Sequence, residues 1–265
     1  MNDFPHTDFS EALGALGPIT LEEMDGITLM NRIDTKYLTD EATLLKILSD
    51  AARDGYRVLE VNGDRIGAYD SVYFDTEGMK CFLDHHNRRL VRQKVRTRSY
   101  VKQGKSFLEI KRKNNKGRTS KKRIAIPVSE MMDFREDAQA TAFLAEHSWF
   151  TAADLFPSTE TSFQRITLVN AAETERLTID TALYFRNFRT GKEASLRNAV
   201  IIELKQDGRA SSPMKGILLD HRVKPVRISK YCIAVTLTAE HLKTGRFKTK
   251  VRTIEKVINH KIMTI

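Results

Sequence analysis

The chain has 265 residues, of which 41% are hydrophobic and 29% are charged. This hydrophobic fraction is sufficient for a real core, and the lack of any apolar run near the length of a membrane span excludes a helical membrane protein. The net charge of +10 favours an anionic partner, either nucleic acid, a membrane surface or a phosphate-rich small molecule.

The cysteine usage and the N-terminal segment indicate the compartment. Cys81 and Cys232 lack a CxxC spacing and zinc-like histidine partners, so we expect buried thiols in a reducing cytoplasm. The N-terminal segment MNDFPHTDFSEALGAL is acidic and has no apolar signal core. We therefore expect a cytoplasmic protein.

The N-terminal part of the chain is predicted to be mainly helical. Residues 8–25 and 40–54 have helical spacing, and the second segment has Thr39 as its candidate N-cap and Gly55 as its stop signal. The segment NRIDTKYL between them is a candidate strand.

From Tyr69 to about Val128 the sequence is typical of an antiparallel meander. β-rich runs alternate with turn-like residues: YDSVYFDT, MKCFLDHH, RLVRQKVRTRSYV, KSFLEIKRK and SKKRIAIPV. The segment SEMMDFREDAQATAFLAEH that follows is predicted to be a helix capped by Ser129.

A second β region is predicted in the C-terminal half. Its strands are TSFQRITLVNA, RLTIDTALYFRNF, AVIIELKQDG and, near the end, RISKYCIAVTL, with a short helix after Ser212. The basic tail, residues 240–265, has apolar residues at helical spacing, so we expect a C-terminal helix that packs on the sheet. No linker interrupts the chain, which favours a single domain over 1–265 with its core at about 27–237.

Four cations alternate along the segment RLVRQKVRTRSY. Residues two apart on a strand lie about 7 Å apart on one face, so Arg92, Lys94, Arg96 and Arg98 would share a face. At an effective dielectric of about 20, each neighbouring pair repels by about 2 kcal/mol. Such a face is therefore either fully solvated or faces a polyanion.

Other predicted strands repeat this division into an ionic and an aliphatic face. Glu109, Lys111 and Lys113 share one face of FLEIKRK, and Glu203 and Lys205 share one face of VIIELK. In SKKRIAI, Lys122 shares a face with Ser120, Ile124 and Ile126. A closed antiparallel barrel with a polar interior and helices on the outside would gather the ionic faces around one lumen. Arginines and lysines there would hold phosphates, and the carboxylates a divalent cation.

The ordered motifs NRIDTKYL, SVYFDT, VRTRSY, FLEIKRK, GRTSKKR, FQRITL, VIIELK and ISKYC resemble the VTC domain over about Ile27 to Leu237. This domain is the polyphosphate polymerase module of the triphosphate tunnel metalloenzyme, or CYTH-like, superfamily. The resemblance implies an α+β fold with a closed eight-stranded antiparallel β-barrel, and transfer of the γ-phosphate of ATP to polyphosphate with Mn²⁺ or Mg²⁺.

The resemblance also implies roles for single residues. It implies a metal-binding role for Glu203, which Glu109 would assist. It places Arg96, Arg98, Lys111 and Arg165 in catalysis. The implied phosphate-binding residues are Lys36, Arg96, Arg98, Lys111, Lys122, Arg165 and Lys230. The ionic strand faces add Arg92, Lys94, Lys113 and Lys205 as further candidate cations.

Two departures from the family pattern narrow this interpretation. The CYTH relatives open with an ExExK signature, whereas this chain has RIDTK at residues 32–36, which favours the VTC branch. The eukaryotic VTC proteins also carry an SPX domain and membrane spans, and this sequence shows neither, so coupling of synthesis to membrane transport is not implied.

Three alternatives stay open. The same cationic site could hydrolyse inorganic triphosphate or polyphosphate, because a water acceptor and a phosphate acceptor need the same groups. It could also only bind polyphosphate. A nucleic-acid-binding protein would explain the charge and the basic segment KNNKGRTSKKR, but the sequence lacks aromatic stacking residues and a recognition helix. The sequence leaves the metal, the nucleotide preference and the oligomeric state open.

Overall fold

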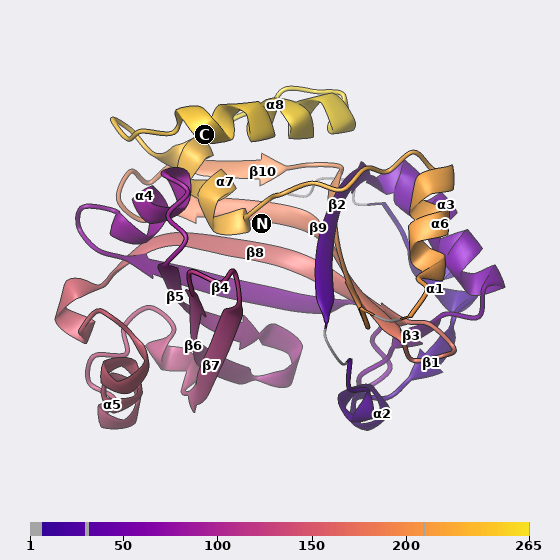
Figure 1. The fold of residues 1–265 in the computed structure, drawn as a ribbon, viewed down its shortest axis with the longest axis horizontal. Helices are drawn as coiled ribbons and strands as arrows, with labels where there is room; N and C mark the ends of the chain where they lie inside the picture. Colours follow the sequence, from indigo (N-terminus) through magenta and orange to yellow (C-terminus); the bar gives the residue numbers. More distant parts are fainter. Residues whose placement is uncertain (1–6, 30–31, 209, 265) are drawn as a thin grey trace.

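The structure, a computed structural model, describes residues 7–29, 32–208 and 210–264. It has an α+β fold built on one large, mostly antiparallel sheet, with α-helices packed around it (Figure 1). The strands are β1 (Gly17–Ile19), β2 (Ile33–Asp40), β3 (Arg57–Leu59), β4 (Gly67–Asp75), β5 (Arg92–Tyr100), β6 (Lys105–Lys113), β7 (Thr119–Ile126), β8 (Phe156–Val169), β9 (Glu175–Asn187), β10 (Glu193–Leu196) and β11 (Ala199–Gln206). The helices are α1 (Ser10–Gly14), α2 (Leu21–Gly26), α3 (Glu41–Arg53), α4 (Lys80–His86), α5 (Ala138–His147), α6 (Pro213–Asp220), α7 (Lys230–Thr238) and α8 (Gly245–Ile258).

The main path through the sheet has eight strands and two ends. The order is β2-β11-β9-β8-β4-β5-β6-β7, and within the described ranges β2 and β7 are not paired with each other. The sheet is therefore open, which corrects the expected closed barrel. β7 carries the lysines and exposed backbone that are typical of an edge strand.

The open sheet is nevertheless curled. Glu203 on β11 and Lys111 on β6 are five strand steps apart in the sheet order, which is about 24 Å in a flat sheet. Even so, the Glu203 charge partly offsets the lowering of the Lys111 pKa by burial, and the Lys111 charge helps to lower the pKa of Glu203. Such coupling requires that the two ends of the path bend toward each other and form a trough.

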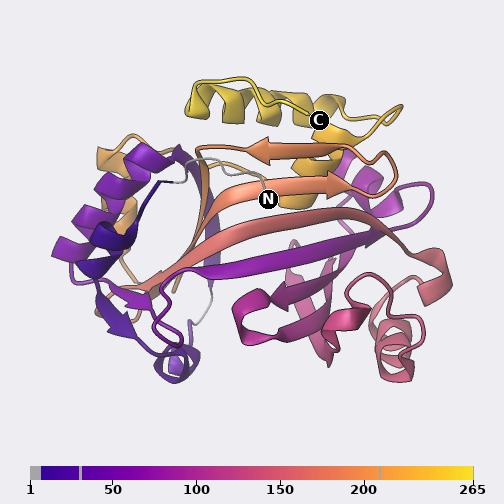
Figure 2. The same ribbon diagram turned by 180° about the vertical axis from the view of Figure 1, so that it is seen from behind.

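Helices cover the aliphatic side of the sheet. Leu44 and Ile47 of α3 pack in one cluster with Leu177 and Ile202 from β9 and β11. A second cluster joins α7 and α8 to β9 and β10, and a third joins α5 to β4, β5 and β6. Figure 2 shows from behind how α8 lies along β10 and how α3 lies at the other end of the sheet. The aliphatic faces of the predicted strands are thus buried, and their ionic faces point the other way.

Two predicted strands are helices in the structure. MKCFLDHH forms α4, whose first turn is held by Asp75: its Oδ1 accepts the Cys81 N–H and its Oδ2 the Phe82 N–H. KYCIAVTL lies in α7, whose N-cap Ser229 accepts the Cys232 N–H. Short runs that are apolar on all sides do not distinguish a buried helix from a strand.

The other helices follow the sequence with shifted boundaries. The predicted helix over 8–25 is split into α1 and α2 by β1, and Thr20 forms a capping box with Glu23 at α2. Asp40, rather than Thr39, caps α3, and Asp137, rather than Ser129, caps α5. The helix after Ser212 and the helix in the basic tail are confirmed as α6 and α8. Within the described part of the chain, no helix combines the length and apolarity needed to cross a membrane.

Candidate functional site

The alternating cations of β5 face the ionic side of β6. The register pairs Arg96 with Glu109 and Lys94 with Lys111, and it pairs Arg92 with Lys113. Directly paired residues in adjacent antiparallel strands place their side chains on the same face. On the other neighbour of β5, Tyr73 of β4 is paired with Arg96.

Arg96 is the centre of a buried ion-pair group. Its Nε and Nη2 donate to Oε2 of Glu109 at 2.8 and 2.6 Å, and its Nη1 donates to the Tyr73 hydroxyl at 3.0 Å. Lys121 of β7 forms an ion pair with the other carboxylate oxygen of Glu109. Burial opposes ionisation of Glu109, but Arg96, Arg98 and Lys121 lower its pKa well below the usual value. Glu109 is therefore an anion that is shared by two cations.

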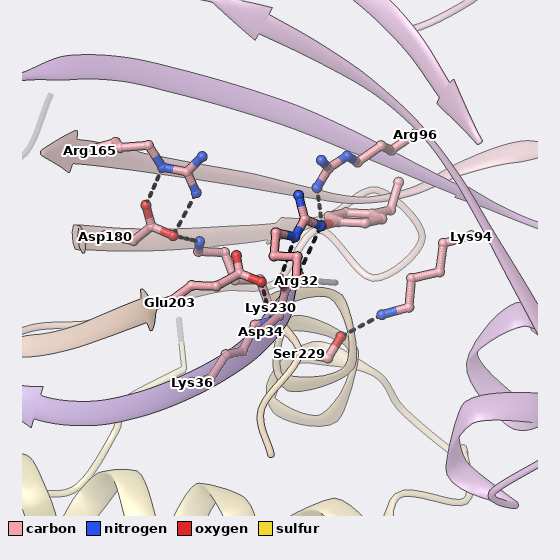
Figure 3. A network of polar contacts seen from close by, with 11 residues as sticks. Arg32, Asp34, Lys36, Lys94, Arg96, Arg165, Asp180, Glu203, Ser229 and Lys230 are labelled. Carbon is pink, nitrogen blue, oxygen red and sulfur yellow. Dashed lines mark hydrogen bonds and ion pairs between the residues drawn. The ribbon is translucent and has the colours of Figure 1, made fainter. Parts of the chain in front are cut away.

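A second group joins β8, β9 and α7. Asp180 of β9 accepts from Nε of Arg165 at 2.6 Å and from Nη2 at 2.9 Å, and Lys230 donates to the same carboxylate. Lys230 is the first residue of α7, and its Nζ lies 3.8 Å from the centroid of the Phe163 ring. Figure 3 shows Arg165 and Lys230 converging on Asp180 from different elements.

A third pair lies at the other end of the trough. Lys36 of β2 and Glu203 of β11 are directly opposite in the register, and Nζ of Lys36 donates to Oε1 of Glu203 at 2.7 Å (Figure 3). Burial raises the pKa of Glu203, but Lys36, Lys205 and Lys111 outweigh it and bring the pKa to about 2. The low pKa means that Glu203 is ionised. Because 22% of its side chain is exposed, the carboxylate is also accessible.

Burial lowers the pKa of several lysines in the trough. It lowers the pKa of Lys111, Lys205 and Lys230 to about 8, and neighbouring arginines act in the same direction. Burial, together with the Arg96 and Arg165 charges, also lowers the pKa of Arg98 to about 10. A bound polyanion would relieve this mutual repulsion.

Tyr73 is the one phenol with a strongly lowered pKa among the described residues. Burial raises its pKa, but Arg96, Arg98 and Lys94 outweigh burial and bring the pKa to about 7. Its ring stacks on Tyr231 with centroids 4.9 Å apart. Lys94 reaches across to α7, where its Nζ donates to the Ser229 hydroxyl at 2.7 Å.

The structure brings most of the residues proposed from the sequence to this face, with one exchange. Lys111 is paired with Lys121, whereas Lys122 is paired with Ile110 of the buried aliphatic cluster. Lys122 therefore lies on the opposite face of β7, and the Lys121 side chain forms the ion pair with Glu109. The proposed phosphate-facing set is Lys36, Arg96, Arg98, Lys111, Lys121, Arg165 and Lys230, with Arg92, Lys94, Lys113 and Lys205 alongside.

Three residues of this face were missed in the sequence. Asp180 and Tyr73 each contact a proposed phosphate-binding cation, and Lys121 contacts Glu109, the carboxylate that holds Arg96. Asp180 alternates with Thr178 in TIDT, and this polar alternation in a strand was the available signal. Tyr73 lies in the quoted motif SVYFDT, but nothing in that motif shows what its hydroxyl contacts.

The carboxylates differ in their fitness as metal ligands. Both oxygens of Glu109 bind cations and its side chain is 0% exposed, so it does not fit that role. Glu203 is ionised and partly exposed, and it fits. The described residues contain no group of three or more His, Cys, Asp or Glu side chains that could hold a metal by themselves. Mg²⁺ in phosphate-handling proteins is usually held by one or two carboxylates and the substrate phosphates, and Glu203 suits that arrangement.

Solved structures similar to this chain are distant. HpAC1 from Hippeastrum, described as having a dominant triphosphatase activity, has a TM-score of 0.46 and 14% identity, covering 80% of this chain and 99% of its own. A conserved hypothetical protein from Pyrococcus furiosus has a TM-score of 0.41 and 11% identity, covering 75% and 99%. The PH1819 protein from Pyrococcus horikoshii has a TM-score of 0.42 and 11% identity, covering 78% of this chain and 100% of its own. These scores are too low to support an argument about function.

Comparison of the sequence with known families identifies the family of the chain. No curated protein matches the chain. The family model of the VTC domain, however, matches residues 31–239, which include β2 with Lys36 and the start of α7 with Lys230. This match confirms the resemblance inferred from the ordered motifs. The chain belongs to the VTC domain family.

Proposed function

We propose that this protein transfers the γ-phosphoryl group of a nucleoside triphosphate, ATP in the first instance, to a growing polyphosphate chain. The observation that carries the proposal is the convergence of cations from seven elements on one curled face, where they outnumber the carboxylates. The cations are Lys36, Arg96, Arg98, Lys111, Lys121, Arg165, Lys205 and Lys230, and the carboxylates are Glu109, Asp180 and Glu203.

The arginines are held so that their forks can bind phosphate. Arg165 uses Nε and Nη2 on Asp180, which directs Nη1 away from the carboxylate. Arg96 is fixed by Glu109 through Nε and Nη2, and its Nη1 donates to the Tyr73 hydroxyl. Planar guanidinium groups that are positioned in advance bind phosphate oxygens without an ordering cost at the moment of reaction.

Phosphoryl transfer needs mainly alignment and charge stabilisation. Arg96, Arg98, Lys111 and Arg165 would hold the triphosphate in line with the acceptor and offset the charge that develops on the leaving group. The acceptor is a phosphate that is already ionised, so no strong general base is needed. A divalent cation, Mn²⁺ or Mg²⁺, would be held by Glu203 and would neutralise charge on the phosphate oxygens.

The test is incubation of the purified protein with ATP and Mn²⁺ or Mg²⁺, followed by gel analysis for long polyphosphate. Polymer formation that is lost in Glu203→Ala and in Arg96→Ala supports the proposal. Release of inorganic phosphate from ATP or tripolyphosphate without polymer would instead show a hydrolase that uses the same face. Binding of duplex DNA that polyphosphate does not displace would contradict both.

A further inference from the structure

A hollow adjoins the phosphate-facing residues where β4 begins. Its inner part, of about 70 Å³, is lined by Gly67, Tyr69 and Arg165 and extends to the turn at Asp64. An outer hollow of about 420 Å³ shares Asp64 and Ile66 with it, so the two adjoin, and we refer to them together as the recess. The outer volume alone lies in the range of about 300–1,000 Å³ that is usual for small-molecule sites.

The recess is lined by apolar residues, by polar residues at its rim and by three cations. Leu59, Val61 and Ile66 line it and are partly exposed. The exposed residues Asn62 and Asp64 form its rim, and Gln103 adds a further polar group. The cations that line it are Arg65, Lys102 and Arg165. An apolar wall with a few polar groups is the usual composition of a site for a flat organic group.

The rim is a rigid turn. Val61 and Asp64 exchange two backbone hydrogen bonds, at 2.9 and 3.0 Å, around Asn62 and Gly63, which both have positive φ. This is the arrangement of a tight two-residue hairpin turn. Asp64 is further held by an ion pair with Lys102 at 2.6 Å. The rim carboxylate is therefore held in place before any ligand arrives.

A glycine keeps the inner part open. A Cβ atom on Gly67 would lie 3.1 Å from Cε2 of the Tyr69 ring, closer than ordinary van der Waals contact. The same ring stacks on Phe163, with centroids 5.4 Å apart and planes at 9°. A side chain at position 67 would thus fill the space beside Tyr69 and next to Arg165.

We propose that this recess binds the nucleoside of the triphosphate substrate, so that the base lies against the apolar residues and the ribose or base hydrogen bonds to Asp64 and Gln103. Arg165, which lies in both the recess and the trough, then connects the nucleoside to its phosphates. This inference rests on the proposed function and adds to it the discrimination of a nucleoside triphosphate from an inorganic one.

The test compares two ligands by isothermal titration calorimetry: a non-hydrolysable ATP analogue and inorganic tripolyphosphate, both with Mg²⁺. Asp64→Ala combined with Gln103→Ala removes the rim groups, and Val61→Trp fills the recess. Each variant should raise the Kd of the ATP analogue about fivefold or more, as expected for the loss of one good hydrogen bond. The Kd of tripolyphosphate should change less than about twofold. Glu146→Ala, which removes a carboxylate on the exposed surface of α5, should change neither.

Two results would overturn the inference. An unchanged Kd for the ATP analogue in both variants would show that the recess does not hold the nucleoside. A parallel loss of affinity for both ligands would show that the substitutions act through Arg165 alone. In either case, binding of tripolyphosphate by the wild-type protein would leave the proposed function standing. A wild-type protein that binds neither ligand would remove both proposals.

Discussion

Asp180 holds Arg165 by two hydrogen bonds, at 2.6 Å to Nε and 2.9 Å to Nη2, and only 4% of the Asp180 side chain is exposed. Lys230 contacts the same carboxylate. One buried anion therefore sets the positions of two cations that come from β8 and α7. A phosphate that enters this part of the trough meets a cation pair that is already assembled.

The first prediction concerns Asp180→Asn, which keeps the shape of the side chain and removes its charge. Because two buried cations lose their counter-charge, we expect the unfolding free energy to fall by about 3–5 kcal/mol. Added tripolyphosphate should raise stability more in the variant than in the wild type, since phosphate replaces the lost anion. Urea unfolding with and without ligand measures both effects. Asp133→Asn, at the exposed pair with Arg135, is the control and should change stability far less; an equal loss in both would contradict the prediction.

A second prediction separates two adjacent lysines. Lys121→Ala should lower the affinity for tripolyphosphate, because Lys121 lies beside Glu109 on the phosphate-facing side. Lys122→Ala removes the same charge from the opposite face of β7 and should leave the affinity almost unchanged at about 0.15 M salt, where exposed charges are screened beyond about 8 Å. Calorimetric titration of both variants checks the register, and equal losses would mean that only total charge matters.

A third prediction concerns the metal. Glu203→Gln should strongly reduce Mn²⁺- or Mg²⁺-dependent turnover, since the partly exposed carboxylate is the ligand that fits. In EDTA the same variant should bind tripolyphosphate at least as tightly as the wild type, because a negative charge has left the trough. Glu109→Gln should instead show its main effect on stability, as its carboxylate is buried between Arg96 and Lys121. Equal behaviour of the two variants in both assays would contradict this division of roles.

The fourth prediction is a fall in polyanion affinity at alkaline pH. Lys111, Lys205 and Lys230 have pKa values near 8, so they are charged below that pH and lose charge above it. Hydrogen bonds to charged groups are worth about 1.5–3 kcal/mol each, so the Kd of tripolyphosphate should rise more than about tenfold from pH 7 to pH 9. Replacing Lys111 and Lys205 together by Arg, which keeps its charge, should flatten the profile; a wild-type affinity that does not change over this range would contradict the assignment.

Tyr73 gives a fifth prediction near neutral pH. Its pKa of about 7 means that a phenolate forms beside Arg96 as the pH rises, and the phenolate competes with phosphate for that guanidinium. Tyr73→Phe should therefore remove the part of the pH dependence between about pH 6 and 8 and retain the part near pH 8–9. The phenolate absorbance of the wild type near 295 nm, followed with and without tripolyphosphate, measures the titration directly, and an unchanged pH profile in the variant would contradict this role.

Much of the site could be predicted from the sequence because side-chain alternation along a strand is a local property. The row from Arg92 to Arg98 and the pair Glu203 and Lys205 lie on single faces in the structure as predicted. The helices α3 and α8 could likewise be predicted from apolar spacing, and α6 from its N-cap Ser212. The helices α4 and α7 could not be predicted in this way, because their segments are short and buried. The first turn of α4 is held by Asp75 of β4.

The sequence by itself determined the chemistry: a basic chain with cationic strand faces and the ordered motifs of the VTC domain. Only the tertiary structure decided which charges meet. In the structure Lys36 contacts Glu203, and Arg165 and Lys230 share Asp180. Lys121, rather than Lys122, contacts Glu109. The curled sheet is open between β2 and β7 in the described residues. Register, curvature and strand order depend on hydrogen bonds and packing between segments far apart in the chain, and no local pattern of residues encodes them.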